Sequence, residues 1–170
     1  MMDTYSMNNG YCSPGIVTGK PINVGGSLGR TDATGLGIAF TITNAVKHKK
    51  MNLKGLKVVI QGYGNVGSAV GKFLSEMGCK IVAVSSSKGG IYNPKGISHG
   101  ALMKHYQEHG SFDHFPRAES ITNESLLELP CDVLVPAAMG NQITKQNAGK
   151  IKAKMVVEGA NGPTTTEADQ

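Results

Sequence analysis

The sequence lacks several features that would place it in a specialised class of protein. Tryptophan is absent, aromatic residues make up 5%, and the three cysteines (Cys12, Cys79 and Cys131) form no Cys-x-x-Cys pair. Neither a disulfide framework nor a zinc site is supported, so we expect a reducing compartment such as the cytoplasm and no metal. No segment reaches the roughly 18 apolar residues of a membrane helix, and no basic run leads into an apolar stretch near Met1. We therefore expect neither a membrane partner nor an export signal.

A concentrated positive charge is also missing. The formal net charge is +5, from 17 Lys and Arg against 12 Asp and Glu, but the lysines occur singly or in short pairs such as Lys49-Lys50. A nucleic-acid surface would need a basic stripe with aromatic side chains on which bases stack. The lysines are better interpreted as a solvated surface, and we expect no nucleic-acid partner.

The length and composition favour one globular unit. The chain has 170 residues, 39% hydrophobic residues and 23 glycines, without a repeat, a low-complexity tract or a linker. This profile is typical of an α/β protein with many tight turns. We therefore expect residues 1–170 to form a single domain.

Hydrophobic patterning predicts alternating strands and helices. Apolar residues after Thr31 recur at three- and four-residue steps up to Val46, which indicates a helix with one buried face. The continuous β-branched run at 57–62 is typical of a parallel strand that is buried on both faces. With a helix at 65–77 and a strand at 79–85, it forms one βαβ unit. The remaining expectations are a short helix at 1–10, an irregular segment at 15–29, helices at 98–109, 123–129 and 144–151, and strands at 131–137 and 154–160. The predicted fold class is α/β, a Rossmann-like doubly wound, mostly parallel sheet with helices on both faces.

A Gly-x-Gly-x-x-Gly motif lies at residues 62–67, between the first predicted strand and the helix that follows it. In this position Gly62 permits a tight turn, Gly64 leaves space for a diphosphate, and Gly67 lets the helix approach the strand. The amides and the positive dipole end of the helix from Asn65 would face the phosphates. The alternative is that these are turn glycines without a ligand.

The end of the second predicted strand bears on the choice of cofactor. A carboxylate that holds the ribose hydroxyls of NAD(H) is usual about 20 residues after the motif. This sequence has Ser85-Ser86-Ser87-Lys88 there. Hydroxyls and the Lys88 ammonium could accept a 2′-phosphate, so we expect NADP(H) in preference to NAD(H). The preference fails if Lys88 only points into water.

Five blocks together resemble the cofactor-binding domain of the glutamate, leucine, phenylalanine and valine dehydrogenase family. They cover essentially the whole chain in the family's order, and the GGSLGR and EGANGPTT blocks are most similar to glutamate dehydrogenases. The blocks are TGKPINVGGSLGRTDATG, VVIQGYGNVG, IVAVSSSKGGIYNPKG, CDVLVPAAMGNQIT and VVEGANGPTT.

The resemblance implies roles for individual residues. Arg30 and Thr34 would lie near the nicotinamide end of the cofactor, although Thr34 could instead cap its helix and Arg30 could pair on the surface. Asn161 would face the ribose or carboxamide, unless it only forms a turn before Gly162-Pro163. The full set of candidate cofactor-binding residues is Arg30, Thr34, Gly62, Gly64, Asn65, Val66, Gly67, Ser86, Lys88, Ala137, Ala138, Asn141 and Asn161.

Two positions depart from the family pattern. Gly140 stands where an acid usually precedes the asparagine of the third-strand block, and Ser86 stands where an acid usually follows the second strand. The first departure removes a capping or supporting contact. The second bears on cofactor choice, and it also disfavours a methyltransferase that uses S-adenosylmethionine, which needs an acid there.

By resemblance, the function is NAD(P)-dependent oxidative deamination of an L-amino acid, most simply of glutamate to 2-oxoglutarate and ammonia. The family's catalytic lysine and acid/base carboxylate belong to a substrate domain that these motifs do not include, so we expect no catalytic residue here. The expected partners are the dinucleotide, the amino acid only with the substrate domain, and further copies in a homo-oligomer. The alternative is a catalytically inactive nucleotide-binding or regulatory module.

Overall fold

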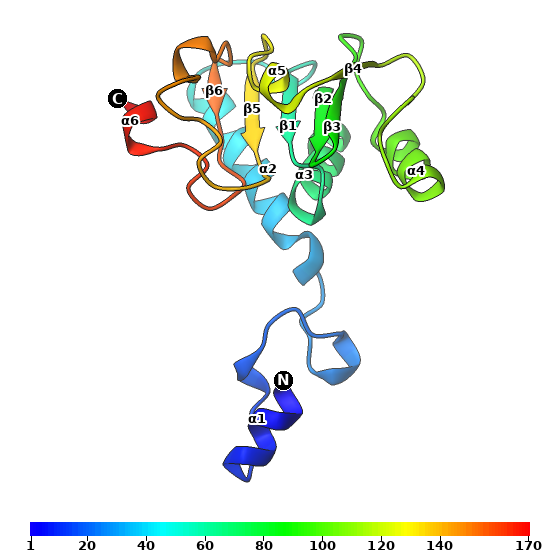
Figure 1. Cartoon of the computed structure of the whole chain (residues 1–170), viewed down its shortest axis with the longest axis vertical. Helices are drawn as coiled ribbons and strands as arrows, with labels where there is room; N and C mark the ends of the chain where they lie inside the picture. Colours follow the sequence, from blue (N-terminus) through cyan, green and yellow to red (C-terminus); the bar gives the residue numbers. More distant parts are fainter.

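A computed structural model describes all 170 residues, and its central element is a six-stranded sheet (Figure 1). The strands lie in the order β4-β3-β2-β1-β5-β6. β1, β2, β5 and β6 are parallel, whereas β3 is antiparallel to β2 and β4 is antiparallel to β3. Their bounds are β1 Lys57–Gln61, β2 Lys80–Ser86, β3 Gly89–Tyr92, β4 Glu119–Ile121, β5 Val133–Pro136 and β6 Met155–Val156. The mostly parallel α/β sheet predicted from the sequence is therefore confirmed.

Helices cover both faces of this sheet. Successive residues of β1 alternate between two buried clusters, with Val58 and Ile60 facing α2, α3 and α4 and Val59 facing α5. This alternation is the two-residue period of a strand that is buried on both sides. The bounds are α1 Met2–Asn9, α2 Arg30–His48, α3 Asn65–Glu76, α4 His99–His109, α5 Asn123–Leu127 and α6 Thr166–Asp169. None of these helices has the length and apolar character that crossing a bilayer requires.

The N-terminal 29 residues project away from the sheet (Figure 1). They contain α1, ended by the left-handed Gly10, and two 3-10 turns at Pro14–Ile16 and Ile22–Val24. No residue before Gly35 is buried. The short helix and the irregular segment that the sequence predicts here are both present, but neither contributes to the core.

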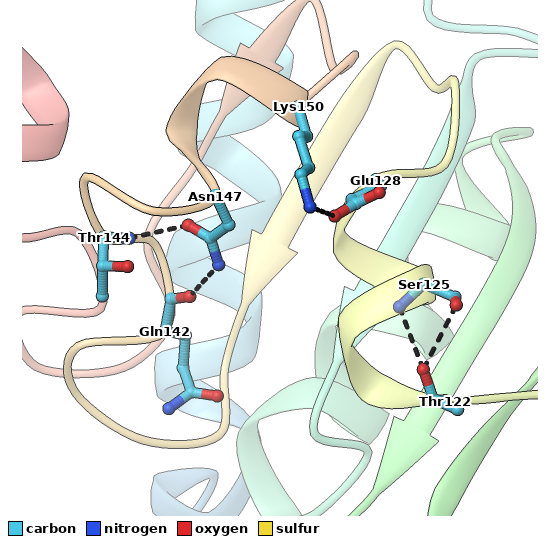
Figure 2. A network of polar contacts seen from close by, with 7 residues as sticks. All are labelled: Thr122, Ser125, Glu128, Gln142, Thr144, Asn147 and Lys150. Carbon is cyan, nitrogen blue, oxygen red and sulfur yellow. Dashed lines mark hydrogen bonds and ion pairs between the residues drawn. The ribbon is translucent and has the colours of Figure 1, made fainter.

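Residues 144–151 do not form the predicted helix; only a 3-10 turn at Ala148–Lys150 is present. The side-chain amide of Asn147 makes two hydrogen bonds to the preceding backbone. Its Oδ1 accepts from Thr144 N–H at 2.8 Å, and its Nδ2 donates to Gln142 O at 2.8 Å (Figure 2). Such local side-chain bonds offer the backbone an alternative to helix. An ion pair of 3.5 Å between Lys150 and Glu128 ties the turn to the end of α5.

The pair β3–β4 was not predicted, and the last strand is shorter than predicted. β3 follows β2 after only Ser87 and Lys88, and β4 has three residues, so neither has a long apolar run. Gly90 fits β3 because an added Cβ would lie 2.9 Å from the Ser85 side chain. The strand predicted at 154–160 shortens to Met155–Val156.

Small residues allow α2 and α3 to pack closely. A Cβ added at Gly35 would lie 2.4 Å from Ala69 Cβ and 2.9 Å from Val70 N, whereas Gly37 has nothing within 4 Å. We expect Gly35→Ala to lower the free energy of unfolding by about 1–3 kcal/mol, since it overpacks this contact.

The matched control is Gly37→Ala, which should raise the free energy of unfolding by up to ~1 kcal/mol because alanine is the better helix former. Urea unfolding of both variants measures the difference. Equal effects of the two substitutions would contradict the close helix contact.

Candidate functional site

The carboxyl ends of β2, β1 and β5 meet at one edge of the sheet. β1 is paired with β2 on one side and with β5 on the other, so the chain changes direction across the sheet at this point. In open α/β sheets, ligands bind in the crevice outside such a switch point. The glycine motif follows β1 directly and lies in this crevice.

The three glycines of the motif have different surroundings. Gly62 has a φ of 84°, and a Cβ there would lie 2.7 Å from Ala138 Cα. Gly67 lies at the start of α3, where a Cβ would be 2.0 Å from Gly62 O. Gly64 has nothing within 4 Å of its added Cβ. The turn is thus closed against the neighbouring strand and helix, and open at Gly64.

Amide groups at the start of α3 face this open side without acceptors. No side chain caps the helix, its first turn contains no acidic residue, and the first hydrogen bond runs from Ser68 N–H to Gly64 O. The amides of Asn65, Val66 and Gly67 therefore have no acceptor within the chain. Such unpaired donors at the positive end of a helix fit a diphosphate.

A smaller hollow of about 270 Å³ lies on the side of the turn toward β2. It brings together three of the predicted regions, namely the glycine turn, Ser86 and the two alanines after β5. Its lining residues are Gly62, Tyr63, Gly64, Ser86, Ser87, Tyr106, Phe112, Ala137 and Ala138. Lys88 does not line this hollow and is exposed. Of these two predicted residues, only Ser86 lines the hollow.

Ser86 already makes local hydrogen bonds. Its Oγ accepts from Lys88 N–H at 3.2 Å and lies 3.5 Å from Gly89 O, and its carbonyl accepts from Asn123 Nδ2 at 2.9 Å. The hydroxyl is thereby held at the tight turn between β2 and β3. Ser86 lies at the end of the strand as predicted, with α5 fixing its backbone.

A larger hollow of about 690 Å³ lies on the other side of the turn. It joins the start of α2 to the start of α3 and the irregular segment before α2. Arg30 and Thr34 line it together with Asn65 and Val66. Thr34 does not cap α2, which follows Gly29 without a side-chain cap, and Arg30 makes no ion pair, so the two alternative roles for them are wrong.

Asn141 and Asn161 lie on adjoining loops but line neither hollow. The Asn141 N–H donates to Gly162 O at 3.0 Å, and Asn141 has a φ of 55°. A Cβ at Gly140 would lie 3.2 Å from Asn161 O, so a glycine here allows the two loops to approach. Gly140 therefore lies close to the neighbouring loop, and a side chain there would require a small adjustment of that loop.

Three aromatic residues that line the smaller hollow were not among the predicted site residues, namely Tyr63, Tyr106 and Phe112. Tyr106, on α4, and Phe112, just after it, have ring centroids 4.9 Å apart. Their six-residue separation carries no motif, and only the fold brings them to the end of β2.

Comparison with known proteins identifies relatives over nearly the whole chain. The family model described as Glutamate/Leucine/Phenylalanine/Valine dehydrogenase matches residues 25–170. A glutamate dehydrogenase of Thermotoga maritima is 52% identical over 99% of this chain, and an NAD-specific glutamate dehydrogenase of Staphylococcus aureus is 49% identical over 99%. The chain spans 41% and 40% of the length of these two relatives.

A solved structure agrees with this relation. The hetero-hexameric glutamate dehydrogenase of Thermus thermophilus, in its leucine-bound form, superposes with a TM-score of 0.89 and 39% identity, over 99% of this chain and 39% of that one. The NAD-specific name of the Staphylococcus relative gives no support to the predicted preference for NADP(H).

The geometry of the turn predicts opposite tolerances at its first two glycines. We expect Gly62→Ala to lower the free energy of unfolding by about 2–4 kcal/mol, because its left-handed backbone and its contact with Ala138 both disfavour a Cβ. Gly64→Ala should change it by less than about 0.5 kcal/mol, because the added methyl group meets nothing. Urea unfolding measures both variants. A larger loss for Gly64→Ala than for Gly62→Ala would rule out this arrangement of the turn.

Proposed function

The chain belongs to the glutamate/leucine/phenylalanine/valine dehydrogenase family, and we propose that its 170 residues form the dinucleotide-binding domain of an amino-acid dehydrogenase. The observation that carries the proposal is the open turn at Gly64, with unpaired amides at the start of α3, at the point where three parallel strands end. A diphosphate lies against bare amides in this position.

We assign the two halves of the dinucleotide to the two hollows. The adenosine half occupies the smaller hollow, where Ser86 and Ser87 face its ribose and Tyr106 and Phe112 form an apolar wall. The other half extends toward the larger hollow, where Arg30 and Thr34 orient the nicotinamide. Bound nicotinamide supplies a hydride acceptor. Further contacts are assigned to Asn65, Val66, Ala137, Ala138, Asn141 and Asn161, while Lys88 remains a candidate only for a 2′-phosphate.

The proposed reaction is oxidative deamination of an L-amino acid, with glutamate as the first candidate substrate. It requires a group that moves protons at the amino acid, and neither hollow is lined by an aspartate or glutamate. Lys20 lines the larger hollow, but its ammonium already donates to Pro14 O and Val17 O, each at 2.7 Å. This chain therefore binds the dinucleotide, and turnover depends on the substrate domain of a cytoplasmic homo-oligomer.

Recombination of domains tests the enzyme against the alternative of an inactive binding module. The 170-residue chain alone should bind the dinucleotide without glutamate-dependent reduction of it. Addition of a separately produced substrate domain from a glutamate dehydrogenase should restore reduction, followed by absorbance at 340 nm. If binding occurs but no tested substrate domain restores turnover, the inactive module is the better description.

Gly64→Val tests the phosphate turn. The side chain would fill the space that the diphosphate needs, so the affinity for NAD(H) and NADP(H) should fall about 100-fold or more, or ~2.7 kcal/mol. Stability should change little, because Gly64 has no neighbour within 4 Å of the added Cβ. Calorimetric titration measures binding, and Gly100→Val, an equally open position in α4, is the control. Wild-type affinity in the Gly64 variant would place the dinucleotide elsewhere.

Ser86→Asp tests the choice of cofactor. A carboxylate at the end of β2 would repel a 2′-phosphate and accept hydrogen bonds from ribose hydroxyls. Binding of NADP(H) should therefore become less favourable relative to binding of NAD(H) by about 1–3 kcal/mol, the size expected for like charges near a protein surface. Ser86→Asn adds similar volume without charge and should change the ratio of the two affinities less. An unchanged ratio in the aspartate variant would show that Ser86 does not face the ribose.

A further inference from the structure

Tyr63 belongs to the phosphate-binding turn through its backbone, but its side chain is buried behind the turn. Its N–H donates to Ser85 O at 2.7 Å, and the side chain is 7% exposed. The ring makes an edge contact with Phe112, with centroids 6.0 Å apart. The hydroxyl lies over α3 at Gly71, where an added Cβ would come within 2.8 Å of three Tyr63 atoms. The second residue of the motif is thus anchored between two helices.

The anchor is a hydrogen bond between α4 and the turn. Tyr63 Oη lies 2.9 Å from His99 Nδ1, and the Tyr63 hydroxyl has no other hydrogen-bond partner in the structure. Burial raises the pKa of Tyr63, so the hydroxyl keeps its proton. Burial also lowers the pKa of His99, the Lys72 ammonium lowers it further, and Glu76 opposes both. Because the phenol hydrogen has no other acceptor, we assign the phenol as the donor to Nδ1 of a neutral ring, which places the ring hydrogen on Nε2.

Burial and the Lys72 ammonium favour this neutral form, and Glu76 opposes it. Lys72 and Glu76 of α3 and Lys80 and Cys79 at the start of β2 line a common hollow of about 490 Å³ with His99. Burial raises the pKa of the Cys79 thiol to about 11, so it adds no charge near neutral pH. His99 is also the first residue of α4, where the helix dipole disfavours a cation.

We propose that His99 is a positioning residue for the phosphate-binding turn: by accepting the Tyr63 hydroxyl hydrogen, it holds the backbone from Gly62 to Gly64 in the shape that receives a dinucleotide. The inference rests on the proposed function of that turn. Sequence reasoning gave no role to either side chain. His99 lies 36 residues from Tyr63 and reaches it only through the packing of α4 on α3.

Protonation of His99 removes the acceptor. A proton on Nδ1 turns this nitrogen into a donor that faces the phenol, and the buried hydroxyl hydrogen loses its only partner. Because the His99 pKa lies below its ordinary value of 6.5, the acceptor is present throughout the neutral range. Dinucleotide affinity is therefore constant above that value and falls as the pH decreases through the lowered pKa. Stability shows the same direction, since the unfolded chain takes up the proton at a higher pH than the folded chain.

Two substitutions separate the acceptor from the titration. His99→Asn places an amide oxygen close to the position of Nδ1 and does not titrate. Tyr63→Phe keeps the ring contacts and removes the hydroxyl. His109→Asn, an exposed histidine at the end of the same helix, is the control. Affinity is measured by calorimetry from pH 7.5 down through the His99 pKa, which NMR titration of the ring provides. The ligand is oxidised dinucleotide, whichever of NAD⁺ and NADP⁺ binds more tightly at pH 7.5.

In the wild type and in His109→Asn, affinity should fall about tenfold once the His99 ring is protonated, because the buried Tyr63 hydroxyl hydrogen is then left without an acceptor. His99→Asn should match the wild type within about twofold at pH 7.5 and show a flat profile. Tyr63→Phe should bind about fivefold to tenfold more weakly at pH 7.5, also with a flat profile. A wild-type profile that stays flat while the His99 ring titrates, or affinity that rises as the ring is protonated through attraction of the diphosphate to imidazolium, overturns the proposal.

A readout without ligand separates this proposal from the function on which it rests. In ¹⁵N-resolved spectra, the amide signals of Gly62 and Gly64 should shift with the titration of the His99 ring in the wild type and not in His99→Asn. If neither dinucleotide binds at pH 7.5 but these shifts occur, the proposed function fails and the link between His99 and the turn stands. If the amide signals of Gly62 and Gly64 do not change as the His99 ring titrates, the link between His99 and the turn is refuted.

Discussion

The close backbone approach at the end of β1 is the constraint on which the rest of the structure depends. Gly62 touches Ala138 after β5, and Gly67 touches the Gly62 carbonyl from the start of α3. A side chain at either glycine would separate the two strand ends or lift the helix from the sheet. Because both contacts involve main chain, they hold the ends of β1 and β5 and the start of α3 close together. The bare amides lie at this helix start, which no side chain caps.

Small residues extend this arrangement through the α2 and α3 layer. Gly35 seats α2 against Ala69, and Gly71 lets the Tyr63 hydroxyl lie on α3. At each contact a glycine, having no side chain, lets its neighbour approach the helix backbone. Helix α3 is thus contacted by α2 on one side and by the Tyr63 ring on another. The larger hollow results from this packing, since Arg30 and Thr34 stand on the first turns of α2, opposite Asn65 of α3.

Local patterns determined the parts of the fold that the sequence could predict. The parallel strands β1, β2 and β5 are continuous apolar runs, and the tight turn at Gly62 and the close approach at Gly67 follow from the position of the motif between β1 and α3. The pair β3–β4 was missed because neither strand has an apolar run of its own. Strand β3 begins with Gly89-Gly90, β4 has only three residues, and both depend on pairing beside β2. The helix predicted at 144–151 fails because the Asn147 side chain bonds its own loop. In the site, Tyr106, Phe112 and His99 could not be foreseen, because only the packing of α4 brings them to the turn.

The two outermost strands of the sheet, β4 and β6, have three and two residues. A sheet edge offers unpaired amide and carbonyl groups on which a strand of another molecule can add, and long flat edges are templates for aggregation. Edges this short present only one or two such groups in register. The folded sheet therefore presents only short edges to which a strand of another molecule could add.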